Sequence, residues 1–429
     1  MTKLSTQSYK GARDFYPEDK RLQSYLFAVM RSVCSRYGYE EYDAPILEPT
    51  DLYLQKGNQE IIKEQTYTFE DRGGRSVTMR TEMTPTVARM VAGKRQELGY
   101  PLRWYSIPQC WRYERMQRGR GREFYQLNID IFGDDSITAE HELLLLISDL
   151  MKSYGASDEM YTIRVGSRLL LDYIAKEILQ LTDDKKRQFM SLLDKLQKIE
   201  EKSFYQQLSE LVDGSSEKID FVRRLTEANQ LAELDEKLQH HDSISRLEEL
   251  LKLCRSSGLT NVLFDPAITR GFEYYTDIVF EVFDRHPENN RSMFGGGRYD
   301  SLVADFGVEP VPTVGFGMGD HTLQNFLELH DLLPELSTET DVYVVCVGDT
   351  YQAAIGIVTT LREQKLNVAL DVSNRKIEKS IKAAEKKAIE YVLFIGQSEL
   401  ESGQLSLRNI QTGEEFKAGI DEISQKLLG

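Results

Sequence analysis

The sequence contains one strip in which arginine, glutamate and aromatic residues alternate closely. Residues 111–126 read WRYERMQRGRGREFYQ, and five arginines fall in the eleven residues from Arg112 to Arg122. The planar guanidinium group of arginine donates two parallel hydrogen bonds to a phosphate or a carboxylate. Activation of a carboxylic acid with ATP needs positive charge around a phosphate, a flat partner for the adenine and a fixed approach for the acid. The strip has these parts, although by composition alone a solvated charged hairpin is the favoured interpretation.

The elements around the strip predict how it is held. Apolar runs at 77–79, 102–107 and 124–132 are bounded by turn residues and indicate strands, so the Arg/Gly loop joins two of them. Apolar residues at helical spacing predict helices over 20–37 and 138–154. Because strands and helices follow each other without a regular βαβ rhythm, we predict an α+β fold with an antiparallel sheet.

Changes in composition predict the domain organisation. Residues 168–258 are rich in Leu, Lys, Glu and Gln and predict a helical insertion, with a turn at 213–216, between a first part of the catalytic domain at 1–167 and a second at 259–330. Strand and helix alternate in residues 340–429, which indicates a small, mostly parallel α/β domain. The linker is predicted at 330–340.

The strip resembles motif 2 of the class II aminoacyl-tRNA synthetases, which has an Arg-x-Glu, a loop, and an Arg and Phe on the returning strand. Further segments resemble the histidine-specific family of that class, in the family's order and over nearly the whole chain. These segments are 11–14 (GARD), 42–45 (YDAP), 80–85 (RTEMTP), 269–275 (TRGFEYY) and 294–300 (FGGGRYD). A C-terminal α/β domain like the family's anticodon-binding domain completes the match.

The resemblance implies ATP as a substrate, with Mg²⁺ as the counterion of its phosphates. Arg112 and Arg270 are then the catalytic residues, which stabilise the charge that develops around the α-phosphate. Glu114 is expected to meet the adenine amino group or orient the loop. Phe124 is expected to stack on adenine, and Arg120 to reach the outer phosphates.

The resemblance also implies a pocket for L-histidine. Glu82, with Thr84, and Gln126 are expected to hold the ammonium group, while Asp130 and Tyr275 contact the two imidazole nitrogens. Such a pocket discriminates well, because a substrate without a ring N–H leaves a buried carboxylate unpaired. The complete set implied for histidine is Glu82, Met83, Thr84, Arg112, Gln126, Asp130, Arg270, Tyr274 and Tyr275.

One segment departs from the class. Motif 3 commonly ends in Gly-x-Glu-Arg, whose arginine meets the γ-phosphate, whereas residues 314–323 read VGFGMGDHTL and place Thr322 at that position. Arg120, Arg298 or another cation must then cover the γ-phosphate if ATP is used. His321 offers a donor there, but a lone histidine is more often a local hydrogen-bonding residue.

The resemblance implies tRNA(His) as a partner and a homodimer. Arg115, Gln117 and Arg118 are the candidates for contact with the acceptor end of the tRNA. In the C-terminal domain Lys379, Lys382 and Lys386 share one helix face, for which an anticodon contact and a solvated surface are equally compatible with the lysines alone. The family's order of segments favours the first.

Global properties limit the alternatives. The net charge of −16 does not exclude a nucleic-acid partner, because binding needs only a local basic strip. No apolar run approaches the ~18 residues that cross a membrane, and the four cysteines form no CxxC pair, so we expect a cytoplasmic protein.

Two other functions remain open. The first is a non-catalytic, histidine-binding regulatory paralog like the subunit that partners ATP phosphoribosyltransferase; Thr322 supports it, whereas Arg112, Arg122, Arg270 and the extra domain favour the synthetase. The second is an ATP-dependent amino-acid ligase with another acceptor, which would not need an anticodon domain.

Overall fold

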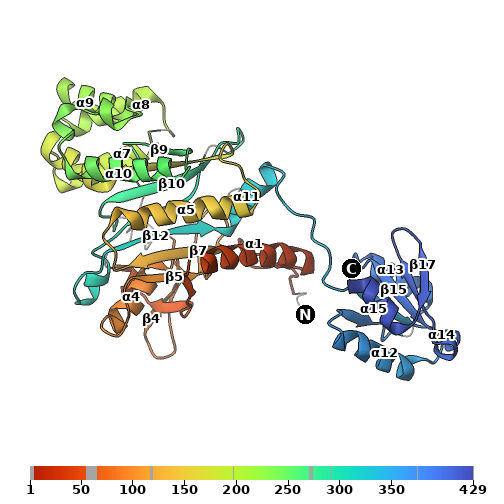
Figure 1. Cartoon of the computed structure of the whole chain (residues 1–429). Helices are drawn as coiled ribbons and strands as arrows, with labels where there is room; N and C mark the ends of the chain where they lie inside the picture. Colours follow the sequence, from red (N-terminus) through yellow and green to blue (C-terminus); the bar gives the residue numbers. More distant parts are fainter. Residues whose placement is uncertain are drawn as a thin grey trace. The chain divides into compact units, whose positions relative to one another are not determined.

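The computed structural model describes residues 4–54, 65–115, 119–196, 198–269, 274–289, 291–373 and 375–428. The chain divides into two compact units, Met1–Leu333 and Pro334–Gly429. The second unit is the blue part of Figure 1.

A large sheet forms the centre of the first unit. Its strand order is β1 (Glu40–Glu41), β5 (Leu102–Ser106), β7 (Glu123–Phe132), β12 (Thr313–Gly319), β11 (Ser292–Arg298), β10 (Ile278–Asp284), β8 (Tyr161–Ser167) and β9 (Val262–Phe264). A further strand, β6 (Gln109–Trp111), pairs with the start of β7 and closes the hairpin predicted for the arginine strip. All neighbours are antiparallel except β1–β5 and β8–β9, which confirms the predicted α+β class.

Two long helices cover one face of this sheet, and their apolar stripes explain why. They are α1 (Pro17–Arg36) and α5 (Ile137–Ser153), which confirm the two helices predicted from periodicity (Figure 1). Met30 and Ile147 are fully buried with Leu127 and Ile129 of β7 in the main core. Gly38 follows α1 with φ +74°, the left-handed conformation that ends helices and that glycine adopts at little cost.

A smaller core lies on the other face, where α4 (Thr84–Lys94) packs beside the short helix η4 (Val303–Phe306). It joins Val87 and Val91 of α4 to Phe132, Tyr274 and Tyr299. A three-stranded sheet, in the order β2 (Leu47–Pro49), β4 (Ser76–Met79) and β3 (Thr68–Glu70), and the short helix α2 (Asp51–Leu54) adjoin this region.

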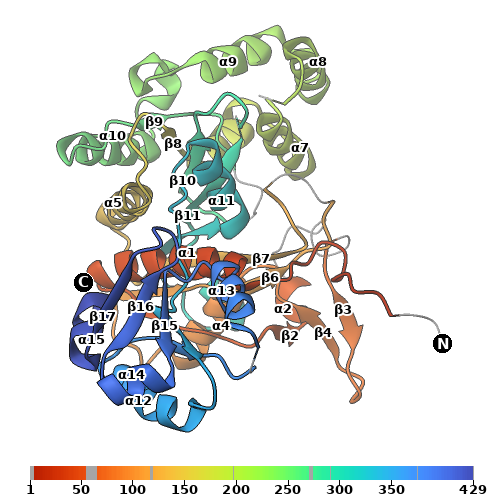
Figure 2. The same ribbon diagram turned by 90° about the vertical axis from the view of Figure 1, so that its right-hand side faces the viewer.

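Helices occupy most of the chain between β8 and β9. They are α6 (Arg168–Tyr173), η1 (Ile174–Ile178), α7 (Asp183–Asp194), α8 (Glu201–Leu211), α9 (Ser216–Glu227), η2 (Leu231–Glu233), η3 (Glu236–Leu238) and α10 (Asp242–Ser256), and Figure 2 shows α7–α10 together beyond β8 and β10. The predicted turn at 213–216 lies between α8 and α9. Because α10 packs against α5, this helical stretch belongs to the first compact unit. The helix α11 (Asp320–Leu329) follows β12 and ends this unit.

The second unit has its own five-stranded sheet. Its elements are β13 (Val342–Cys346), α12 (Tyr351–Glu363), β14 (Val368–Leu370), α13 (Ile377–Glu385), β15 (Tyr391–Ile395), α14 (Gln397–Ser402), β16 (Leu405–Asn409), β17 (Glu415–Ala418) and α15 (Ile420–Leu428). The order is β14-β13-β15-β16-β17, parallel over the first three strands and antiparallel over the last three. The sheet is therefore mixed and not mostly parallel as predicted. The turn at 410–414 is too short for the crossover that a parallel strand needs, which explains why β17 is antiparallel to β16.

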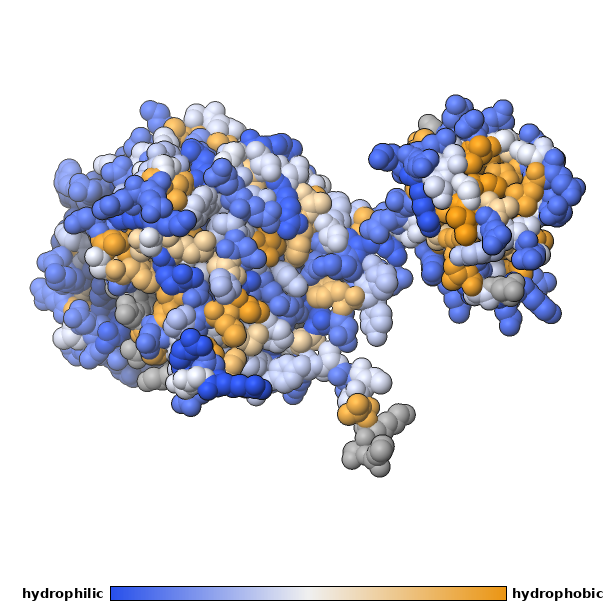
Figure 3. Space-filling view, turned by 90° about the horizontal axis from the view of Figure 1, so that it is seen from below, coloured by the Kyte–Doolittle hydropathy of each residue, from blue (hydrophilic) through white to orange (hydrophobic). Residues whose placement is uncertain are grey.

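The surface fits a charged globular chain. In Figure 3 hydrophilic residues cover much of the visible face of each unit, and hydrophobic residues gather on part of the second unit. Within the described ranges, no helix combines the length and the apolar character needed to cross a membrane.

Candidate active site

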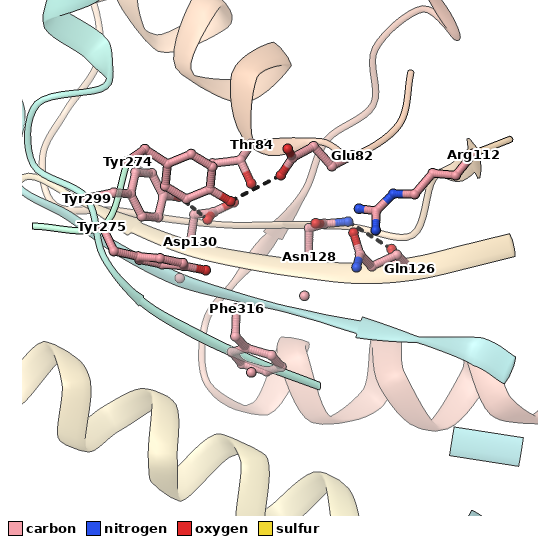
Figure 4. A pocket seen from close by; sticks show the side chains of 13 residues that line it. Glu82, Thr84, Arg112, Gln126, Asn128, Asp130, Tyr274, Tyr275, Tyr299 and Phe316 are labelled. Atoms are coloured by element: carbon pink, nitrogen blue, oxygen red, sulfur yellow. Dashed lines mark hydrogen bonds between the residues drawn. The ribbon is translucent and has the colours of Figure 1, made fainter. Parts of the chain in front are cut away.

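A pocket opens on the face of the large sheet that lies opposite α1 and α5. It encloses about 400 Å³ of space, part of it open to solvent. Figure 4 shows the side chains that line it: Glu82, Thr84, Arg112, Gln126, Asn128, Asp130, Tyr274, Tyr275, Tyr299 and Phe316. The pocket thus collects residues from nearly the whole length of the first unit.

The alternation of β7 supplies one wall. Gln126, Asn128 and Asp130 are two residues apart and point to the same face, because successive side chains of a strand point to opposite faces. The intervening Leu127 and Ile129 lie in the main core.

Glycines of the neighbouring strand β12 leave room for these side chains. A Cβ atom on Gly315 would stand 2.1 Å from Asp130 Oδ1, and one on Gly317 would stand 2.9 Å from the Gln126 amide. Any larger residue at Gly315 would therefore displace the carboxylate at the end of the pocket.

The inner end of the pocket holds a buried carboxylate among tyrosines. The Tyr299 hydroxyl donates a hydrogen bond to Asp130, and the rings of Tyr274 and Tyr275 are 4.8 Å apart beside it. Burial raises the pKa of Asp130 to about 7, because the charged form loses its hydration, and the Tyr299 hydrogen bond opposes the rise. This carboxyl can accept from an N–H when ionised and is near its midpoint at neutral pH.

A second carboxylate, Glu82, lies along the pocket towards its mouth. The Tyr274 hydroxyl donates to Glu82 Oε2 at 3.1 Å, and Thr84 stands beside it as the first residue of α4. Glu82 is 8% exposed, so its charge is available to a cation in the pocket with little competition from water. The Met83 side chain is fully buried and is not among the residues that line the pocket.

Arg112 stands at the opposite end from Asp130 (Figure 4). Its Nε donates to the Thr81 carbonyl at 2.9 Å, and its Nη1 lies 3.7 Å from Glu114. The guanidinium carbon is 5.3 Å from the centre of the Phe124 ring. Arg112 is therefore held in place and still presents N–H donors towards the pocket.

The outer part of the hairpin is more exposed. Arg120 is 63% exposed and lies 3.6 Å from Glu114, and Arg115 is exposed as well. Gln117, Arg118 and Arg270 lie outside the described residues.

The departure from motif 3 has a clear local structure. Thr322 donates to the Gly319 carbonyl at 3.0 Å in the first turn of α11. The His321 ring is held 3.2 Å from the Glu123 carbonyl, and burial lowers its pKa. The suggestion that Arg298 covers the γ-phosphate is wrong: Arg298 is 2% exposed and pairs with Glu140 at 2.6 Å and 2.7 Å.

Six lining residues were missed by the sequence reasoning, namely three glycines, Gly295, Gly315 and Gly317, and three residues with larger side chains. Asn128 lies between Gln126 and Asp130 on the same strand face, so the two-residue period alone could have identified it. Tyr299 belongs to the 294–300 segment that the resemblance used. Phe316 lines the floor from β12; it lies in the 314–323 segment compared with motif 3, but that comparison gave it no role.

The arrangement suits a small zwitterion that carries a ring N–H. One carboxylate faces the inner end, another lies midway, and a guanidinium stands at the outer end beside an aromatic ring and further arginines. An antiparallel sheet that carries an arginine hairpin of this form on β6 and β7 is the catalytic fold of a class II aminoacyl-tRNA synthetase.

Comparisons with known proteins specify the family. Residues 11–323 match the family model described as histidyl-tRNA synthetase, and residues 341–429 match an anticodon binding domain. A histidine–tRNA ligase of Leptospira biflexa is 39% identical, covering 99% of this chain and 98% of that protein, and one of Haloarcula marismortui is 37% identical, covering 95% and 94%. The chain belongs to the histidyl-tRNA synthetase family and is thus an aminoacyl-tRNA ligase.

A solved structure agrees in fold. The histidyl-tRNA synthetase from Nostoc sp. PCC 7120 superposes with a TM-score of 0.83 at 24% identity, and the match covers 99% of each chain.

Proposed function

We propose that the pocket binds L-histidine, that the enzyme activates it with ATP to histidyl-adenylate, and that the histidyl group then passes to the 3′ end of tRNA(His). One observation carries the proposal: Asp130, Glu82 and Arg112 follow one another along a single pocket. Their charges complement the imidazole, the ammonium and the carboxylate of histidine in the order in which that molecule carries them.

The chemistry of the first step follows from this placement. A carboxylate oxygen of histidine attacks the α-phosphorus of ATP, and the bond from that phosphorus to the bridging oxygen of pyrophosphate breaks. Arg112 can stabilise the charge on the phosphorus oxygens, since donors that are already in position cost no reorganisation as charge develops. We assign the same task to Arg270 from the opposite side, on the resemblance of its segment alone.

The histidine side chain is selected at the inner end. We propose that Asp130 accepts from one imidazole nitrogen and that Tyr275 contacts the other, with Tyr274 against the ring. Glu82 holds the ammonium group together with Thr84 and Gln126. An amino acid without a ring N–H would leave Asp130 with the Tyr299 hydrogen bond but with no donor from the substrate, which costs ~1–3 kcal/mol.

The nucleotide occupies the outer end. We propose that ATP enters as its magnesium complex, because Mg²⁺ is usually held by substrate phosphates with few protein ligands. Phe124 stacks on the adenine, Glu114 meets its amino group and Arg120 contacts the outer phosphates.

The second step needs the tRNA. The hydroxyl of its terminal ribose attacks the carbonyl carbon of the adenylate, and AMP leaves. We propose that Arg115, Gln117 and Arg118 contact the acceptor end and that the second unit binds the anticodon. Three exposed lysines support that second contact: Lys379 and Lys382 on α13, and Lys386 directly after its end.

We further propose that residues 168–258 form an insertion domain within a catalytic domain of residues 1–167 and 259–330, and that residues 340–429 form the anticodon domain. We also propose a homodimer, because residues 42–45 resemble motif 1 of the class, and a place in the cytoplasm, where protein synthesis consumes charged tRNA.

The experiment is aminoacylation of total tRNA with radiolabelled histidine, ATP and Mg²⁺. We expect acid-precipitable label with histidine and none with Arg112→Ala. A wild-type enzyme that binds histidine but never labels tRNA would favour the regulatory function instead.

A further inference from the structure

A buried cluster of charges lies behind the start of β7. Arg13 Nη2 is 2.7 Å from Asp320 Oδ2, and Arg13 Nε is 3.3 Å from Glu123 Oε2. The side chains of Glu123 and Asp320 are only 3% and 5% exposed, whereas that of Arg13 is 24% exposed. One arginine therefore pairs with two carboxylates that are almost removed from water.

The cluster ties three distant segments together. The second oxygen of Asp320 accepts from the Tyr125 backbone N–H at 3.0 Å, and that of Glu123 accepts from the Gln109 side chain at 3.1 Å. His321, the next residue of α11, also contacts the Glu123 carbonyl.

The N-terminal segment adds backbone contacts of its own. The Gly11 carbonyl accepts from the N–H groups of Arg122 and Glu123 at 2.9 Å and 3.2 Å. A Cβ atom on Gly11 would stand 2.7 Å from the Arg122 side chain, so the two segments are in close contact. Residues 11–13 thus fasten the returning strand of the hairpin to the first turn of α11.

The cluster faces away from the pocket. Glu123 and Tyr125 alternate with Phe124 and Gln126 along β7, and of these four Gln126 lines the pocket. Arg13, which pairs with Glu123, is likewise not among the residues that line the pocket. Arg13 can influence the site by fixing the positions of Phe124 and Arg112. The Arg112 backbone N–H donates to the Arg122 carbonyl at 2.8 Å.

The charges explain why Arg13 matters. A buried carboxylate that loses its partner lowers the stability of the fold by far more free energy than a surface ion pair contributes. Asp320 has two other sources of stabilisation: the Tyr125 backbone N–H, and the positive end of the helix dipole, since it is the first residue of α11. Without Arg13, Glu123 and Asp320 would repel each other, and the contact between β7 and α11 would open.

We propose that Arg13 is a positioning residue for the nucleotide: through Glu123 and Asp320 it fixes the start of β7 and with it Arg112 and Phe124. The proposal rests on the function proposed above. Since Thr322 supplies no cation from α11, binding of ATP depends all the more on the placement of the hairpin.

The test separates ATP from histidine. In histidine-dependent pyrophosphate exchange, we expect Arg13→Gln to raise the KM for ATP about tenfold, which is ~1.4 kcal/mol, and to change the KM for histidine less than about twofold. Arg13→Lys keeps the charge and should restore much of the loss. Asp320→Asn in the Arg13→Gln background removes one of the orphaned carboxylates and should also recover part of it.

A matched control is available in α10. Arg246 is 31% exposed and also joins two buried carboxylates, Asp277 at 2.8 Å and Glu140 at 3.7 Å, without touching the hairpin. Arg246→Gln should leave the KM for ATP unchanged even if it lowers the melting temperature.

Two outcomes would overturn the proposal. One is an unchanged KM for ATP in Arg13→Gln, and the other is an equal rise in both KM values. Calorimetry of ATP binding to each variant tests the role of Arg13 independently of catalysis. If the wild-type enzyme catalyses no exchange, the proposed function fails, and calorimetry still measures the effect of Arg13 on ATP binding.

Discussion

The two ends of the pocket are built differently. At the end proposed for histidine, Asp130 is 4% exposed and Tyr299 is 2% exposed, and hydrogen bonds join Tyr299 to Asp130 and Tyr274 to Glu82. At the end proposed for the nucleotide, Arg120 is 63% exposed and lies 3.6 Å from Glu114. Exposed pairs of this kind contribute little, about 0–1 kcal/mol.

This contrast suits the two ends of the pocket to different tasks. A preorganised, buried end discriminates between amino acids, because any wrong group leaves a desolvated partner unpaired. An exposed end with long side chains can accept ATP, release pyrophosphate and then contact the tRNA. Specificity for histidine should therefore be sensitive to small steric changes, whereas the outer arginines should be individually replaceable.

The largest effect is expected at Arg112, at the outer end of the pocket. Arg112→Ala removes donors at the α-phosphate, and loss of one positioned donor of this type costs roughly 10²–10³ in kcat. The rate of histidyl-adenylate formation in a single turnover measures this loss. A decrease below tenfold would show that the α-phosphate is held elsewhere. Arg270→Ala should likewise lose activation while histidine binding falls less.

The inner end predicts the next effect. Gly315→Ala would place a methyl group against Asp130 and the Ile129 carbonyl, and should raise the KM for histidine about 10²-fold, or ~3 kcal/mol. Gly93→Ala is the matched control: no atom lies near the added Cβ in the exposed part of α4, and helix propensity makes alanine favourable there. Equal KM values in the two variants would contradict the assigned pocket.

The pKa of Asp130 predicts a pH dependence of histidine binding. Because this pKa is raised to about 7, the carboxyl is ionised above pH 7 and neutral below it, while the imidazole of free histidine gains its proton near pH ~6.5. One proton must leave when both partners are protonated, so the KM for histidine should rise up to about tenfold per pH unit below pH 6. In Asp130→Asn the enzyme's contribution to this profile should vanish; an identical profile would refute the assignment.

The smallest effect is expected at Arg120. Arg120→Ala should raise the KM for ATP only about three- to tenfold, since the side chain is exposed and screened. Arg75→Ala is the control, because Arg75 is 81% exposed and pairs with Asp71 in a different turn. A loss as large as that of Arg112→Ala would make Arg120 the replacement for the motif 3 arginine.

Local patterns predicted the elements that build this site. Each of these patterns spans only a few residues and can therefore be recognised in the sequence. They are the helical spacing in α1 and α5, the alternation along β7 and the Arg/Gly turn. The mixed sheet of the second unit was missed for two reasons: β16 is antiparallel to β15 although the helix α14 joins them, and the direction of β17 depends on the length of a turn that carries no apolar pattern.

Long-range contacts could not be predicted in the same way. Burial of Arg298 with Glu140 joins residues 158 apart, and nothing in either segment identifies the other as its partner. The same is true of Tyr299 with Asp130 and of Arg13 with Asp320. The sequence therefore does not distinguish charged residues that face the substrate from charged residues that form ion pairs in the fold behind the pocket.

The central claim is most directly tested by exchange of pyrophosphate into ATP with the purified protein, run separately with each of the twenty amino acids. The account predicts exchange with histidine alone, which would establish the activation chemistry and the selectivity of the pocket together and show that Thr322 is no obstacle. Absence of exchange with every amino acid, while histidine still binds, would contradict it and indicate a regulatory histidine-binding protein.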